Sequence, residues 1–187
     1  MHAYTSSRSR WFHKVCFKLS IMATMKIFGG NNVPLIRNIS PQKGTWRVHW
    51  GKTTDEEGTY YFGYDFDHKP SLDEVKKVIA DWCNEQTQTK ITSEFVWEGN
   101  SVWLSTENQL NYTMAYNMSV KQGENYSPIM LKFGSEENPT YHTFSTSEEL
   151  ADFYFKVTEF IQKTLNDGWL MKDSIDYEAY KTLLESM

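Results

Sequence analysis

Cysteine is scarce in this 187-residue sequence, and long apolar runs are missing from it. Cys16 and Cys83 are the only cysteines, too few for a disulfide framework and too isolated for a zinc cluster. We therefore expect a protein of a reducing compartment, or of an assembly built inside a cell. No stretch approaches the roughly 20 apolar residues that a membrane span needs, so we expect no membrane partner.

The N-terminal segment, residues 1–25, lacks the pattern of a signal peptide. Such a peptide needs an unbroken apolar core of about 7–15 residues, whereas Lys14 and Lys18 bracket only three residues here. Two interpretations remain open. The segment is a basic, weakly amphipathic arm that orders on a partner, or it is an over-extended gene start with Met22 or Met25 as the initiator.

Acidic residues are absent from the first 54 positions, which hold nine of the 19 Lys and Arg residues. All 24 Asp and Glu residues follow, so the net charge of -5 combines a basic start with an acidic body. Broad nucleic-acid binding needs positive charge that displaces counterions from phosphates. The acidic body therefore predicts that nucleic acid is not a partner.

The established catalytic and cofactor-binding motifs are also missing. The chain has no Gly-x-Ser-x-Gly elbow, no His-Glu-x-x-His helix and no Rossmann glycine pattern. The Gly29-Gly30 pair is not followed by Gly-Lys-Ser/Thr, so it is not a phosphate loop. We find no nucleophile with a plausible base, and we predict no catalytic residues, no cofactor and no enzymatic activity.

One cluster of polar residues, Asp65, Asp67 and His68, leaves a metal-assisted enzyme open as an alternative. The two carboxylates share a face of an extended strand, and carboxylate and imidazole groups are common metal ligands. No second ligand group stands at a useful spacing. An Asp-capped turn before Lys69 and Pro70 explains the same residues, and we therefore predict no metal site.

Alternating side chains predict two β-hairpins. In residues 45–66, a polar turn at residues 53–58 joins two strands whose aromatic side chains share one face. That face carries Trp46, Trp50, Tyr60, Phe62, Tyr64 and Phe66. In residues 95–104, Gly99 and Asn100 form the predicted two-residue turn. Shorter strands are expected at residues 129–133 and 139–144, and residues 26–43, with two glycines and Pro34, predict a loop.

Capping residues and apolar periodicity predict four helices. A helix beginning at the Ser71–Glu74 capping box should fray near residues 84–89. A helix after Ser105 or Thr106 has an apolar side, which we expect to contain Leu110, Met114, Ala115 and Met118. The longest helix follows the box formed by Thr146 and Glu149. Its apolar stripe is Leu150, Phe153, Val157, Phe160, Ile161 and Leu165, and Gly168 should end it. Asp176 caps a last helix over residues 177–185.

These elements predict an α+β fold, in which small antiparallel β-ribbons pack against amphipathic helices and one long helix lies near the C-terminus. Residues 84–93 are the best candidate for a boundary between units. We therefore divide the chain into residues 1–25, a ribbon-plus-helix unit at residues 26–90, and an α+β unit at residues 91–187.

Aromatic residues are numerous, with seven Trp, 11 Tyr and 11 Phe. Aromatic side chains fill cores, but Trp and Tyr also favour interfaces. Exposed rings on the predicted ribbons would stack on sugars, which makes a carbohydrate-binding module an alternative function. The candidate binding residues are Trp46, Trp50, Tyr60, Tyr64, Trp97 and Trp103.

The region from Phe95 to Ile175 resembles a phage and prophage domain of unknown function that occurs in tail-fibre and tail-adjacent proteins of gut bacterial phages. The resemblance rests on Phe95-Val96-Trp97-x-Gly99-x-x-Val102-Trp103-Leu104, Glu107-Asn108-Gln109-x-Asn111-Tyr112, Leu131-Lys132-Phe133-Gly134, Tyr141-His142-x-Phe144 and Lys172-Asp173-x-Ile175. The Tyr-rich ribbon and the helix with Trp82 resemble the usual partner of that domain, which extends the likeness to about residues 45–185.

The resemblance implies a non-enzymatic phage protein without catalytic residues. It would be either a virion or tail-associated structural component or a tail-fibre assembly helper. Its partners would be other phage structural proteins or further copies of itself, since a homo-oligomer is compatible with the pattern. Such a protein would reside in the host cytoplasm during assembly or in the virion.

Overall fold

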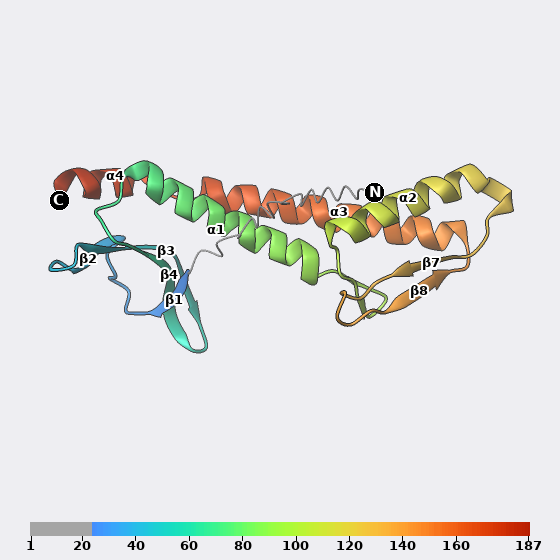
Figure 1. The fold of residues 1–187 in the computed structure, drawn as a ribbon, viewed down its shortest axis with the longest axis horizontal. Coiled ribbons are helices and arrows are strands. Elements are labelled where there is room, and N and C mark those ends of the chain that lie inside the picture. The colour runs from blue at the N-terminus through green and yellow to red at the C-terminus, as the bar shows by residue number, and fades with distance from the viewer. Residues whose placement is uncertain (1–23) are drawn as a thin grey trace, which may run out of the picture.

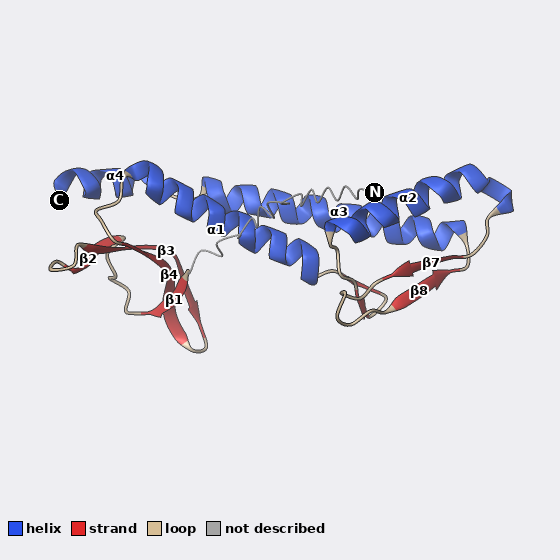
Figure 2. Ribbon diagram, in the orientation of Figure 1, coloured by secondary structure: helices blue, strands red, loops and turns tan. Residues whose placement is uncertain are grey.

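The computed structural model describes residues 24–187 and has the predicted α+β architecture. Two long helices, α1 (Leu72–Ser93) and α3 (Ser147–Asp173), run side by side in opposite directions along an elongated molecule (Figure 1). A four-stranded sheet lies beside one end of this helix pair, and a two-stranded hairpin lies beside the other (Figure 2). The prediction of an N-terminal arm or over-extended start at residues 1–25 falls outside the described residues, except for the last two positions.

The four-stranded sheet is antiparallel, with the order β1-β4-β3-β2. Its strands are β1 (Met25–Phe28), β2 (Ile36–Ser40), β3 (Thr45–Asp55) and β4 (Gly58–Phe66). The predicted hairpin at residues 45–66 is therefore confirmed, with a tighter turn between Asp55 and Gly58. The loop predicted at residues 26–43 is wrong in part, because the glycine-rich stretch only connects two edge strands that pair with the hairpin.

The first hydrophobic core lies between this sheet, α1 and the last helix, α4 (Tyr177–Ser186). Its fully buried side chains come from the sheet and from α1, and Trp50 packs edge-on against Trp82 at 5.9 Å between ring centroids. Asp176 caps α4 through Ala179 N–H, as predicted. The Tyr180 hydroxyl donates a buried 2.7 Å hydrogen bond to the His49 carbonyl, which fixes α4 to β3.

The second core is built around Phe153 of α3. Four rings surround it at 5.0–5.4 Å between centroids: Trp97, Tyr112, Phe133 and Phe144. They come from β5 (Val96–Trp97), α2 (Thr106–Gln122), the end of β7 (Ile129–Lys132) and β8 (Tyr141–Phe144). β5 pairs with β6 (Asn100–Ser101), and the short 3-10 turn η1 (Gly123–Asn125) follows α2.

The β5–β6 turn lies one residue earlier than the sequence predicted. Trp97 pairs with Asn100, so Glu98 and Gly99 are the two turn residues. Both have positive φ, 47° and 78° respectively. This is the conformation that tight hairpin turns require, and glycine adopts it most easily at the second position.

Helix α1 is continuous to Ser93, so the fraying predicted near residues 84–89 is wrong. The predicted boundary at residues 84–93 lies within this helix, and α1 supplies Val75 to one core and Ile91 to the other. A contact with α3 explains why the polar middle of α1 stays helical. Buried Thr87 lies against Gly168, and the Lys172 side chain bonds to Asn84. The division of the chain at residue 90 stays a prediction.

Gly168 lies inside α3, which continues to Asp173, so its predicted role as the helix end is wrong. The residue is buried, and a Cβ built at this position would overlap the Thr87 hydroxyl and lie 2.9 Å from the Thr87 methyl group. Glycine is therefore needed for the close approach of two helices rather than for a helix exit. The long helix does begin as predicted, with the Thr146 hydroxyl accepting from Glu149 N–H.

We predict that Gly168→Ala lowers the free energy of unfolding by about 1–2 kcal/mol. The overlap with Thr87 outweighs the gain of about 1 kcal/mol that alanine brings to a helix. In a Thr87→Ala background the same change should be neutral to stabilising by up to about 1 kcal/mol, because the overlapping hydroxyl and methyl group are gone and the helix gain of alanine remains. Urea unfolding of the four variants measures this coupling. Equal effects of Gly168→Ala in both backgrounds would contradict the close contact.

His49 lies on the other face of β3 and is 3% exposed. Its Nδ1 is 2.8 Å from the Pro34 carbonyl oxygen, which can only accept, so Nδ1 carries the proton. Burial lowers the pKa of His49, since a charged imidazolium is poorly solvated there. The exposed ring of His68 differs, because Asp67 and Glu74 raise its pKa.

We predict that His49 makes the protein less stable as the pH falls below about 6.5, the ordinary histidine pKa. In that range the unfolded chain binds a proton that the folded chain, with its lowered pKa, does not yet bind. His49→Gln should flatten the decline of the urea midpoint between about pH 7 and 5.5. His68→Gln should steepen it, because a raised folded pKa stabilises the protein below 6.5. Identical slopes in all three proteins would contradict this assignment.

Candidate functional site

Two of the six aromatic residues predicted to bind ligands belong to the hydrophobic cores. Trp50 and Trp97 are each 2% exposed, so their assignment to a binding surface is wrong. Trp50 packs between the sheet and Trp82, and the Trp97 ring packs against Phe153. The indole N–H of Trp97 donates to Asp152 at 3.3 Å. Alternation along a strand places these rings on a common face, but it does not tell whether that face meets solvent or a helix.

Three further candidates, Trp46, Tyr60 and Tyr64, are half-buried along the sheet. Trp46 and Tyr64 pack against the first core, and Tyr64 makes an edge contact with Phe66 at 4.8 Å. Tyr60 lies at the far end of β4, where the Lys26 ammonium stands 4.1 Å from its ring centroid. Trp46 and Tyr64 therefore lie at the margin of a core, and Tyr60 contacts Lys26 and Phe62.

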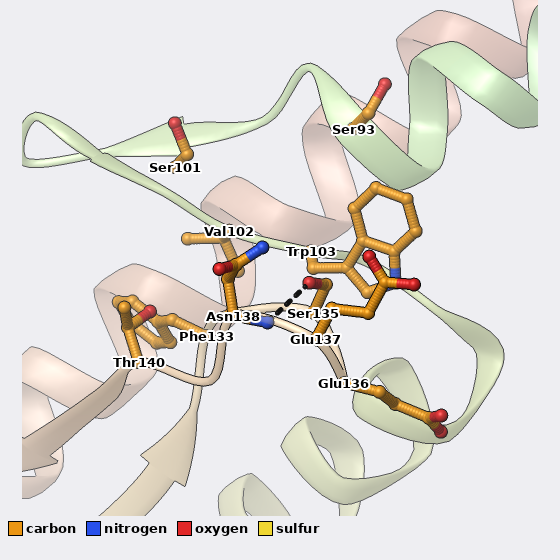
Figure 3. Close-up of a pocket in the computed structure, with 11 residues that line it drawn as sticks. Ser93, Ser101, Val102, Trp103, Phe133, Ser135, Glu136, Glu137, Asn138 and Thr140 are labelled. Atoms are coloured by element: carbon orange, nitrogen blue, oxygen red, sulfur yellow. Dashed lines mark hydrogen bonds between the residues drawn. The ribbon is translucent and has the colours of Figure 1, made fainter.

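The sixth candidate, Trp103, is 38% exposed and lines a hollow. The hollow has a volume of about 680 Å³ and lies between the β6–α2 connection and the loop that joins β7 to β8 (Figure 3). Polar side chains line much of it: Ser93, Ser101, Ser135, Glu136, Glu137, Asn138 and Thr140.

Backbone hydrogen bonds fix both walls of the hollow. Trp103 N–H donates to the Phe133 carbonyl at 2.7 Å, and Phe133 N–H donates to the Thr140 carbonyl at 2.8 Å. A Cβ at Gly134 would overlap the Asn138 carbonyl, so the loop closes only with glycine at this position. The Ser135 hydroxyl accepts from Asn138 N–H at 3.1 Å, which is the bond drawn in Figure 3.

The chemistry of the hollow suits a polar ligand with a flat or cationic face. Glu137 and Trp103 line the same hollow, from the β7–β8 loop and the β6–α2 connection respectively (Figure 3). Within residues 24–187, neither Glu136 nor Glu137 forms an ion pair. Aromatic faces attract cations and stack on sugar rings, and nearby carboxylate, hydroxyl and amide groups supply hydrogen bonds.

The three residues of the metal hypothesis do not converge. Asp65 accepts two hydrogen bonds from the Arg47 guanidinium, at 2.5 and 2.7 Å, on one face of the sheet. Asp67 and His68 follow the strand, where His68 also lies 3.0 Å from Glu74. In the part of the chain that the structure describes, no group of three or more His, Cys, Asp and Glu side chains is arranged to hold a metal.

Glu74 instead serves to start α1. Its carboxylate accepts from the Ser71 N–H and hydroxyl, each at 2.8 Å, and the Ser71 hydroxyl accepts from Glu74 N–H. These bonds, followed by the one from His68, lower the pKa of Glu74 to about 2. The polar residues around His68 are thus explained by the predicted capping box, which is confirmed.

The apolar side predicted for α2 is wrong except at Ala115. Leu110, Met114 and Met118 are 59%, 61% and 47% exposed and point away from the core. The buried side consists of Asn108, Tyr112, Ala115 and Ser119. Hydrogen bonds explain why polar groups face inward. The Asn108 amide donates to the Trp103 carbonyl at 2.7 Å, and the Tyr112 hydroxyl donates to the Lys132 carbonyl at 2.6 Å.

The outward side of α2 is therefore a second candidate site. We define this contact face as seven exposed residues on one side of the helix: Glu107, Leu110, Asn111, Met114, Asn117, Met118 and Lys121. Sequence reasoning missed the face because Leu and Met at helical spacing predict a buried side. The side of the helix that contains Tyr112 also carries a large ring at helical spacing. That ring was the sequence signal that could have indicated which side of α2 is buried.

Comparison with known protein families, with curated proteins and with solved structures found no match. The resemblance to a phage domain accordingly stays a prediction, and the function has to be argued from the two sites above. Within residues 24–187, no helix combines the length and the apolar character needed to cross a membrane.

Proposed function

We propose that this chain is a non-enzymatic phage protein that acts through protein–protein contacts. It would serve as a virion or tail-associated structural component or as a helper of tail-fibre assembly. The observation that carries the contact role is the contact face of α2, where three large apolar side chains are exposed on one helix. The phage setting rests on the sequence resemblance of residues 95–175.

The composition of the contact face supports binding to protein. Apolar side chains stand at its centre, asparagines lie beside them, and one acidic and one basic residue lie at the two ends. Protein interfaces have this arrangement, with an apolar middle and a polar rim. Methionine is flexible and polarizable, which suits surfaces that adapt to a partner. A large exposed apolar patch on a folded chain commonly marks such an interaction site.

The non-enzymatic part of the proposal is supported by the bonds of the polar groups that chemistry would use. His68 is held by Asp67 and Glu74, and His142 bonds to Glu149 at 2.9 Å. Together with the Ser145 N–H, this histidine lowers the pKa of Glu149 and anchors β8 to the start of α3. These contacts hold elements together and account for the residues without a reaction. The expected location is the host cytoplasm during assembly or the finished virion.

A carbohydrate-binding module is the second candidate, favoured by one observation. The Trp103 ring is exposed in the hollow, beside the side chains of Ser93, Ser101 and Asn138. An aromatic ring offers a stacking surface, and convergent polar groups give orientation, which is how small-ligand sites are built. Trp50 and Trp97 are buried and would not contribute to such a site.

We predict that the chain is recovered with purified phage particles or with tail intermediates from a producing lysate. Quantitative mass spectrometry across a density gradient measures this. A fixed copy number per particle indicates a structural component, and presence in tail intermediates alone indicates a helper. Met114→Glu should reduce the recovered amount, whereas Lys76→Glu, an exposed change on α1, should not. A chain that sediments with neither fraction would refute the proposal.

For the second candidate, we predict glycan-array binding that Trp103→Ala abolishes. The matched control is Trp169→Ala, since Trp169 is 54% exposed on α3 and does not line the hollow. Loss of one stacked aromatic ring should weaken sugar binding at least tenfold, or about 1.4 kcal/mol. An array without hits for the unmodified protein would exclude this candidate.

A further inference from the structure

We propose that the contact face of α2 binds the same face of a second copy of this chain, with the two helices antiparallel about a two-fold axis at Met114. This inference rests on the proposed function, because it names the partner for the face that carries it.

The contact face has the same residue spacing when it is counted from either end, and opposite charges at its two ends. From Glu107 to Lys121 the charged and apolar positions are separated by three, four, four and three residues, with Met114 in the middle. An antiparallel partner therefore places Leu110 opposite Met118 of the partner subunit. It also places Asn111 and Asn117 along the two edges of the helix pair, where they form a polar rim. Each apolar residue thus meets a side chain of matching character, as a two-fold interface requires.

Charge decides between antiparallel and parallel pairing. Glu107 and Lys121 are 14 residues apart, or about 21 Å along a helix, so they cannot pair within one chain. Both are exposed, and neither forms an ion pair within residues 24–187. Antiparallel pairing places Glu107 beside the partner's Lys121 twice per dimer. Parallel pairing would place like charges together and align the two helix dipoles unfavourably.

The asparagines and methionines fit the same arrangement. Asn111 and Asn117 lie on opposite sides of Met114, and their amide groups can both donate and accept, so they suit the polar edges of the interface. Asn111 and Asn117 form no hydrogen bond through their side chains in the described part of the chain. Methionine on the axis packs against itself without strain because its side chain is unbranched.

The size of the contact sets the expected strength. A 17-residue helix is about 25 Å long, so a pair of such helices buries less than the roughly 1,200–2,000 Å² of a stable complex. Tyr116, which stacks on Tyr154 of α3, lies on the far side of α2 from Met114 and adds no area to the pair. We therefore expect a dimer that forms at micromolar concentration and dissociates on dilution.

The charge pattern provides the first test, carried out by sedimentation equilibrium on the full chain. Glu107→Lys alone and Lys121→Glu alone each create two like-charge pairs and should weaken the dimer about tenfold. The double variant E107K/K121E restores opposite charges and should restore the affinity. High salt should reduce these differences. A double variant as weak as the single ones would overturn the antiparallel register.

The register provides the second test, by disulfide formation in a C16S background that keeps buried Cys83. Met114→Cys should give a covalent dimer under mild oxidation, because the two introduced thiols meet at the axis. Leu110→Cys should not, but a mixture of Leu110→Cys and Met118→Cys chains should crosslink. Circular dichroism verifies that each variant is folded. Crosslinking of Leu110→Cys with itself would indicate a parallel pair and overturn the proposal.

The experiments distinguish a failure of the self-association from a failure of the proposed phage function. A protein that stays monomeric at several hundred micromolar and gives no Met114→Cys dimer overturns the self-association. If Met114→Glu then still lowers recovery with phage particles, the face binds another protein and the proposed function stands. If particles contain no copies of the chain while the dimer forms, the proposed function fails and the self-association stands.

Discussion

The close packing of α1 against α3 is the contact on which both halves of the molecule depend. Each helix lines both hydrophobic cores, since α1 contributes Val75 and Ile91 and α3 contributes Met171 and Phe153. Between the cores the contact is small and polar, with Thr87 against Gly168. The Thr87 hydroxyl donates to the Cys83 carbonyl of its own helix at 2.8 Å, so the polar atom is satisfied inside the contact. A short interhelical distance at this point fixes the position of the sheet relative to α2.

The second core explains why α2 can expose its apolar residues. Phe153 and the four rings around it already fill the space between α3 and the β7–β8 hairpin. Helix α2 is attached to this core through Tyr112 and Ala115, through the stacking of Tyr116 on Tyr154, and through hydrogen bonds to main-chain carbonyls. Its leucine and methionines are not needed to close the core. The fold therefore leaves them exposed, which is the basis of the proposed contact role.

Features that depend on neighbouring residues were predictable from the sequence. The Ser71–Glu74 box, the Thr146 and Asp176 caps and the alternation in residues 95–104 are satisfied within a few positions, and all four are present. Features that depend on distant residues were not. Gly168 signals a helix end locally, and only Thr87 on another helix reveals its role. Trp103 and Trp97 are both on predicted ribbons, but packing against Phe153 buries one of them, whereas a loop 30 residues later leaves the other in an open hollow.

The elongated shape gives the proposed pairing a structural consequence. Helix α2 lies along the long axis at one end of the molecule, and the four-stranded sheet lies near the other end (Figure 1). A two-fold axis through Met114, perpendicular to α2, reverses the direction of the long axis. The two chains would then overlap only at their α2 helices, and their sheets would stand at opposite ends of the dimer. Because the α1–α3 contact is tight, the two sheets would be held at a defined separation, which suits a protein that bridges two identical partners.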